Sequence, residues 1–219
     1  AINQQLLAAF PQSKNALRAH ADLREKIDSG ATPSAEPTVD AAREIADLLD
    51  CGEFVKALHL SDNMLRQLPH SSVLHNVQGA AHRRLGNFDQ AVKSFQKVLQ
   101  IAPNNALTHN NLGVALTDIG ALNEAVESFK NALEIDPDYA DGYFNLAVAH
   151  GYRDDIEAAI DGYKQTLTLT PDRADAHYNM GNALLQNQCP DDAIDCFRRA
   201  TQIAPDYSKA YNNWGNVLK

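Results

Sequence analysis

Proline returns at a constant interval along most of this 219-residue chain, and this interval restricts the possible fold more than any other feature. Five prolines follow one another at a spacing of 34 residues: Pro69, Pro103, Pro137, Pro171 and Pro205. Alanine keeps the same spacing at Ala57, Ala91, Ala125, Ala159 and Ala193. Self-similarity at such a period is typical of a repeat protein, in which each unit stacks only on its neighbours.

Each period contains two stretches with apolar residues at helical spacing, so each predicts a pair of amphipathic helices. Gly120 is expected to end one first helix in a left-handed conformation, and Pro137 to stop the second helix. An aromatic ring recurs in the second helix, at Phe95, Phe129, Tyr163 and Phe197. A small residue recurs in the first helix, at Gly79, Gly113, Ala147, Gly181 and Gly215. Small residues predict that the paired helices approach closely, toward the short end of the usual 8–10 Å.

This pattern resembles the tetratricopeptide repeat (TPR), a 34-residue helix–turn–helix unit. The resemblance covers residues 38–219. It implies an all-α fold, a right-handed α-solenoid of stacked helix–turn–helix repeats with one concave groove. We expect full repeats at 38–71, 72–105, 106–139, 140–173 and 174–207, followed by a partial repeat at 208–219.

Both ends of the chain depart from the repeat pattern. The first full repeat has Ile45 where a small residue is expected and Ser61 in place of the ring, as terminal repeats often do. Upstream, residues 1–28 predict N-terminal helices, and the composition of residues 29–37 indicates a linker. After the last proline one helix follows, and it leaves three apolar side chains uncovered: Tyr211, Trp214 and Leu218. The chain is therefore interpreted as a fragment of a longer protein.

Asparagine recurs at the sixth position of four repeats, at Asn111, Asn145, Asn179 and Asn213. In the TPR family this side of the first helix lines the groove. An asparagine side chain has one carbonyl acceptor and two N–H donors, so it can bond a peptide unit in both directions. These four residues predict an asparagine ladder that binds an extended peptide through its backbone. The alternative is that the asparagine is a common family residue that duplication has copied without a binding role.

Further polar and aromatic residues are expected beside the ladder. They are Asn182 and Asn216, the acidic Asp141 and Asp175, and the rings of Tyr152 and Tyr178. This groove resembles those of bacterial TPR arrays and of the O-linked N-acetylglucosamine transferase repeats. It differs from the basic clamp by which chaperone-binding members hold a terminal carboxylate. The favoured partner is therefore an extended protein segment with Lys or Arg, and the alternative is a solvated acidic wall with no role.

The charge and the apolar pattern exclude several classes of partner. A net charge of −9 and a pI near 5.3 argue against nucleic acid, because phosphate binding needs a basic surface. No apolar run approaches the roughly 20 residues of a membrane span, and no signal peptide is visible. These features favour a cytoplasmic location, although a processed or truncated chain could have lost a signal. The three cysteines lack the spacing of metal ligands and are interpreted as reduced thiols.

No phosphate-binding loop, nucleophile elbow or zinc-protease motif occurs in the chain. The repeated histidines belong to the packing side of the helices, so they predict no metal site. We therefore expect a non-catalytic binding module that needs no cofactor or metal. Two alternatives stay open. One is the substrate-recruiting region of a larger bacterial glycosyltransferase, sulfotransferase or methyltransferase. The other is a scaffold that associates end to end through its uncovered last helix.

Overall fold

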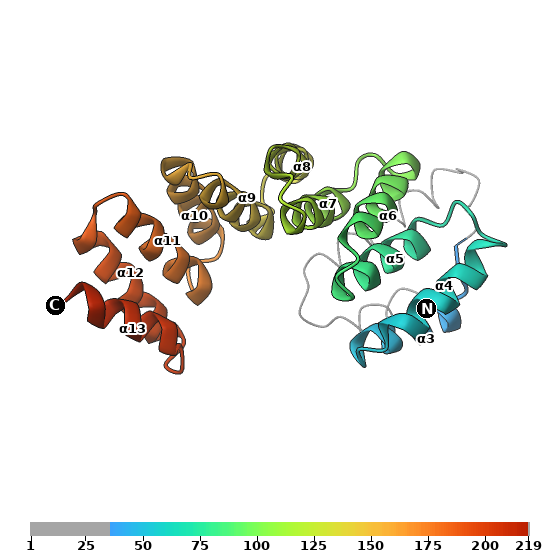
Figure 1. Cartoon of the computed structure of the whole chain (residues 1–219), viewed down its shortest axis with the longest axis horizontal. Coiled ribbons are helices and arrows are strands. Elements are labelled where there is room, and N and C mark those ends of the chain that lie inside the picture. The colour runs from blue at the N-terminus through green and yellow to red at the C-terminus, as the bar shows by residue number, and fades with distance from the viewer. Residues whose placement is uncertain (1–35, 219) are drawn as a thin grey trace. The chain divides into compact units, whose positions relative to one another are not determined.

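The computed structural model describes residues 36–218, and all regular structure in this part of the chain is α-helical (Figure 1). The helices expected in residues 1–28 and most of the linker lie outside the described residues. The chain forms two compact units, unit 1 (Ala1–Ile119) and unit 2 (Gly120–Lys219). Unit 1 contains α3 (Val39–Asp50), α4 (Phe54–Leu65), α5 (Ser72–Arg84), α6 (Phe88–Ile101) and α7 (Ala106–Asp118). Unit 2 contains α8 (Leu122–Ile135), α9 (Ala140–Tyr152), α10 (Ile156–Leu169), α11 (Ala174–Gln186), α12 (Pro190–Ile203) and α13 (Ser208–Val217).

Within each unit, every helix packs against the next helix in the chain. The second helix of a hairpin also contacts the first helix of the following hairpin, as α10 does when it packs against both α9 and α11. The alanine that repeats every 34 residues is completely or almost completely buried in all five hairpins. Within each unit the fold is therefore the predicted all-α stack of helical hairpins.

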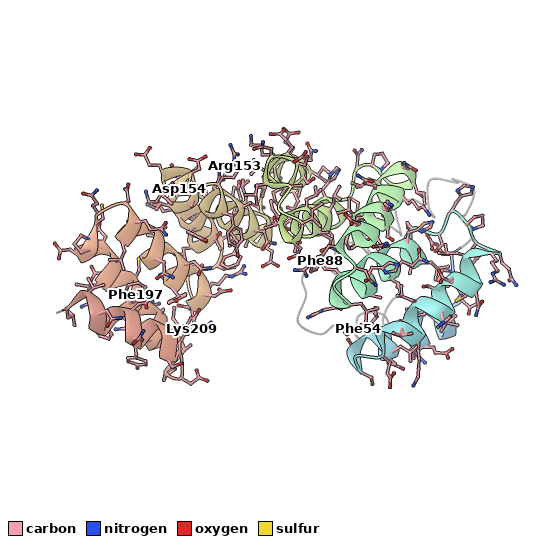
Figure 2. The ribbon with its side chains drawn as sticks, viewed as in Figure 1. Phe54, Phe88, Arg153, Asp154, Phe197 and Lys209 are labelled. Carbon is pink, nitrogen blue, oxygen red and sulfur yellow. The ribbon has the colours of Figure 1, made fainter. Side chains whose placement is uncertain are left out.

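The turn between the two helices of a hairpin contains one residue in the left-handed conformation. Glycine occupies this position at Gly52, Gly86 and Gly120, with φ of 76°, 77° and 79°. The expectation for Gly120 is therefore confirmed. In the next two repeats Asp154 and Gln188 adopt φ of 62° and 58° instead. Figure 2 shows Asp154 in the turn between α9 and α10. The left-handed turn is therefore kept in the two repeats that lack a glycine at this position.

The repeated glycine of the first helix makes room for the aromatic ring of the second helix. A Cβ atom added to Gly79 would lie 2.5 Å from Cε1 of Phe95, and one added to Gly181 would lie 2.7 Å from Cε1 of Phe197. Both distances are shorter than any van der Waals contact, and both rings are fully buried. The glycine therefore accommodates a ring, rather than simply bringing two helix backbones close together.

Two repeats solve the same packing problem with other residues. In the fourth repeat Ala147 replaces the glycine, and the facing residue is Gly162, where an added Cβ would lie 2.8 Å from the Cβ of Ala147. In the first repeat the large residue is on the first helix instead, because Ile45 and Ser61 occupy the positions of the glycine and the ring, and both are buried. The total side-chain volume in the hairpin is therefore shared differently between the two helices.

Candidate functional site

The first helices of successive repeats in unit 2 carry the predicted binding residues. These helices are α9, α11 and α13, and they are held side by side because α10 packs against α9 and α11 while α12 packs against α11 and α13. Side chains of α9 and α11 line one pocket, and side chains of α11 and α13 are joined by hydrogen bonds. The predicted Asn111 is half-buried on α7, which belongs to unit 1.

A pocket of about 300 Å³ lies between α9, α10 and α11. Its lining residues are Val148, Gly151, Tyr152, Ile156, Ala159, Tyr163, Asn179, Asn182, Ala183 and Gln186. Three of the predicted site residues, Tyr152, Asn179 and Asn182, are therefore brought together here. The apolar side chains are the more buried ones and form the floor. The Tyr152 side chain is 69% exposed, and Gln186 is exposed as well, so both belong to the rim.

The asparagines of the proposed ladder differ in their surroundings. Among the described residues, the carboxamides of Asn179 and Gln186 form no hydrogen bond, although both line the pocket. Asn145 is half-buried on α9, and Asn216 is exposed on α13. The half-buried, unbonded carboxamide of Asn179 has both a donor and an acceptor to offer to a ligand.

Asn213 of α13 instead bonds to side chains of α11. Its Nδ2 atom donates to Oδ1 of Asn182 over 2.7 Å, and it lies 3.4 Å from the Tyr178 hydroxyl, to which it also donates. The Tyr178 ring packs against Phe197, with centroids 6.0 Å apart, and against Tyr207, with centroids 5.1 Å apart. Three predicted site residues are thus connected, but the amide nitrogen of Asn213 is already bonded within the protein.

Asp141 and Asp175, predicted as negative charge on the groove, are both paired with Arg173. Nη1 of Arg173 lies 2.6 Å from Oδ1 of Asp141, and its Nε lies 2.9 Å from Oδ1 of Asp175. The guanidinium also stacks 4.0 Å above the ring of Phe144. Burial opposes the charge of Arg173, but hydrogen bonds and charge from Asp175 and Asp141 raise its pKa above the ordinary value. One positive charge therefore compensates part of the negative charge of two carboxylates.

Arg173 is the residue of this candidate site that the sequence pattern did not predict. Its sequence signal was weak: it lies two residues before Asp175, while Asp141 is 32 residues away. In unit 1 a similar pair forms between Nε of Arg83 and Oδ2 of Asp118, at 2.6 Å. Another basic residue of unit 2, Lys209, is exposed on α13 (Figure 2).

Three histidines at the fourth position of their repeats make the same structural contact. Nε2 of His75, His109 and His177 lies 3.1, 2.9 and 2.9 Å from the carbonyl oxygen of the proline six residues earlier. Each such ring therefore donates to the end of the previous repeat. Among the described residues, no three histidine, cysteine or acidic side chains lie close enough together to hold a metal ion. No described helix is both long enough and apolar enough to cross a membrane.

The chain matches known TPR sequences over much of its length. A family model described as "TPR repeat" matches residues 79–120, 115–151 and 152–188, and one described as "Tetratricopeptide repeat" matches residues 174–207. No curated protein sequence matches the chain.

Several solved structures are similar. A structure of the MamA protein is 32% identical, with a TM-score of 0.62, and the match covers 67% of this chain and 80% of that one. MamA from Desulfovibrio magneticus RS-1 is 21% identical, with a TM-score of 0.69 and coverage of 77% and 97%. YrrB, a TPR protein with an unusual peptide-binding site, is 18% identical, with a TM-score of 0.66 and coverage of 87% and 96%. From its repeats and their matches, this chain belongs to the tetratricopeptide repeat family.

Proposed function

We propose that the chain is a non-catalytic interaction module that binds an extended segment of another protein in the groove of α9, α11 and α13. Membership of the TPR family and the similarity to MamA support a role as a protein-interaction scaffold. The observation that carries the finer proposal is the pocket beside Asn179 and Gln186, whose carboxamides form no hydrogen bond among the described residues. YrrB, which shares the fold, is a TPR protein with a peptide-binding site.

The asparagine ladder suits the backbone of an extended peptide. Repeats stack roughly 10 Å apart, and an extended chain rises about 3.3 Å per residue, so one asparagine meets about every third residue of the ligand. Each such bond contributes on the order of 0.5–1.5 kcal/mol net, which predicts a dissociation constant between millimolar and micromolar. Asn179 contributes most in unit 2, because its carboxamide forms no hydrogen bond among the described residues, whereas Asn213 already donates to Asn182. In unit 1, Asn111 occupies the same repeat position.

The charge around the groove favours a basic segment only weakly. Arg173 already binds both Asp141 and Asp175, so a lysine or arginine of the ligand has to compete with it. The net charge left by the three groups is about one negative unit, and both carboxylates are half-exposed to screening by salt. Backbone contacts and the pocket therefore contribute more to binding than ion pairs do.

The function can be tested with peptides selected from a random library of 12-residue sequences. We expect selected peptides to bind the wild-type chain in fluorescence polarisation. The double variant Asn179→Ala/Gln186→Ala should bind about tenfold more weakly, because roughly 1.4 kcal/mol of hydrogen bonding is lost.

The matched control is Asn131→Ala/Gln165→Ala, which removes two exposed carboxamides on α8 and α10. It should bind as the wild type does, and circular dichroism should show equal helicity for all three proteins. Equal affinity of the Asn179→Ala/Gln186→Ala variant and the wild type would show that these two carboxamides do not contribute to peptide binding.

Self-association is a second candidate function, supported by the outer side of α13. Tyr211 and Leu218 are 47% and 64% exposed, and the Tyr211 ring stacks on Trp214 with centroids 6.4 Å apart. Such a patch at the end of a repeat stack can pack against another molecule. Light scattering should then show a mass that rises with concentration, and Tyr211→Lys/Leu218→Lys should abolish the rise. A monomer at every concentration would exclude this function.

A further inference from the structure

We infer that the pocket between α9, α10 and α11 is an anchor site for one uncharged aliphatic side chain of the bound segment, such as leucine or isoleucine. The inference rests on the proposed function and adds the chemical class of residue that the ligand must present. The pocket is built by two successive repeats, so it takes its lining from three helices of unit 2.

The lining of the pocket is uncharged throughout. All ten lining residues are aliphatic, glycine, tyrosine or carboxamide residues. Burial, followed by the nearby Tyr152 and Asp175, raises the pKa of Tyr163, so its phenol stays protonated at neutral pH. A charged side chain that entered would lose water without gaining a full opposite charge, which is unfavourable. Asp175, the nearby acid, is already bound by Arg173.

An uncharged lining is not a general property of hollows on this chain. A larger pocket in unit 1, between α4, α5 and α6, includes Asp62 and Lys97 in its lining. The unit 2 pocket instead has an apolar floor of five residues: Val148, Ile156, Ala159, Tyr163 and Ala183. Its volume of about 300 Å³ is at the small end of ordinary ligand sites, roughly 300–1,000 Å³, and this favours one side chain over a larger cofactor.

The rim of the pocket is suited to the backbone on either side of such an anchor. Asn179, Asn182 and Gln186 lie on one helix around the opening. The side-chain oxygen of Asn182 accepts a hydrogen bond from Asn213, and this bond does not use the two N–H donors of Asn182. The exposed ring of Tyr152 offers an apolar wall on the opposite helix. An aliphatic side chain can therefore be buried while the main-chain N–H and C=O groups beside it are bonded by carboxamides.

The pocket can be filled without disturbing the fold, because Gly151 lines it and an added Cβ there meets no other atom within 4 Å. Gly151→Leu should therefore fold, and it should gain helix propensity relative to glycine. The controls are Gly151→Ala, which leaves most of the volume open, and Gly215→Leu. Gly215 lies on α13, outside the pocket, and its added Cβ also meets no other atom within 4 Å.

The probes are the library-selected 12-residue peptides and their point variants, measured by fluorescence polarisation. We expect the selected peptides to share one aliphatic residue. Replacing it with alanine should weaken binding about tenfold, as expected for the loss of one buried aliphatic side chain, and lysine should weaken it at least as much. Gly151→Leu should bind about tenfold more weakly than the wild type, while Gly151→Ala and Gly215→Leu should match the wild type.

The outcomes separate the anchor from the function on which it rests. If no peptide is selected, both the peptide-binding function and the anchor site are wrong. If peptides bind and lose affinity in Asn179→Ala/Gln186→Ala but not in Gly151→Leu, the function stands and the anchor site is wrong. Selected peptides that share a lysine or arginine in place of an aliphatic residue would also overturn the anchor site.

Discussion

At the scale of single residues, two hairpins pair a large buried ring with a glycine that faces it, and a third pairs two small residues. Gly79 faces Phe95 and Gly181 faces Phe197, while Ala147 is accommodated by Gly162. Because protein interiors are close-packed, an extra methyl group on one helix requires a smaller residue on the other. The repeat is therefore maintained by pairs of positions, and a single position can vary when its partner varies with it.

The two glycines at the same repeat position in unit 2 should respond differently to alanine. Gly181→Ala places a Cβ 2.7 Å from the buried ring of Phe197, and this overpacking should lower the free energy of unfolding by about 1–2 kcal/mol. Gly215→Ala meets no atom within 4 Å, so its helix propensity should raise stability by about 0.5–1 kcal/mol. Urea unfolding followed by circular dichroism measures the free energy of unfolding of both variants. Equal changes would contradict the pairing of Gly181 with Phe197.

At the scale of elements, the hairpin turn constrains the sequence less strictly than the helix interface does. The left-handed residue is glycine in three repeats, but Asp154 and Gln188 adopt the same conformation. A non-glycine residue pays roughly 1–2 kcal/mol there because its Cβ approaches the following carbonyl oxygen. The rest of the hairpin supplies enough packing energy to hold these two turns in place.

Glycine at these turns should therefore stabilise the protein. Gln188→Gly relieves the strained conformation but adds freedom to the unfolded chain, so we expect a net gain of about 0.5–1 kcal/mol. Asp154→Gly should gain less, because aspartate occupies the left-handed region more readily than glutamine does. Thermal melts of the two variants give the comparison, and a lower melting temperature for Gln188→Gly would show that its side chain contributes contacts of its own.

At the scale of the whole molecule, a stack of hairpins has stability that depends on contacts between neighbours. The last helix, α13, packs against α12, and its one fully buried residue is Ala210. Trp214, the single tryptophan of the chain, lies half-buried on this helix. The fluorescence of this residue therefore reports on the packing of α13 against the core of unit 2.

We expect α13 to separate from the stack before the remaining helices unfold. The tryptophan emission should change at a lower urea concentration than the helical signal in circular dichroism, because fewer buried contacts hold α13. Trp214→Phe serves as the control, since it should leave the main helical transition in place. Coincident transitions from the two probes would show instead that the described helices unfold as one cooperative unit.

Much of the fold could be predicted because its contacts are close in sequence. The spacing of proline, alanine and the ring predicted the helix pairs, and the structure confirms the left-handed turn at Gly120. The repeated Ala91 and Phe95 are both buried. In stacked hairpins each helix packs mainly on the next one along the chain, so a periodic pattern carries most of the information about packing.

The tertiary structure alone decided which polar side chains meet. The asparagine period predicted four equivalent groups, but Asn213 donates to Asn182 while Asn179 forms no such bond among the described residues. Likewise, Arg173 is adjacent in space to Asp141, a residue 32 positions away. These outcomes depend on how neighbouring helices are rotated and on which rotamer each side chain adopts. A repeat period determines which residues share a helix face, whereas only the packed helices determine the distances between their polar atoms.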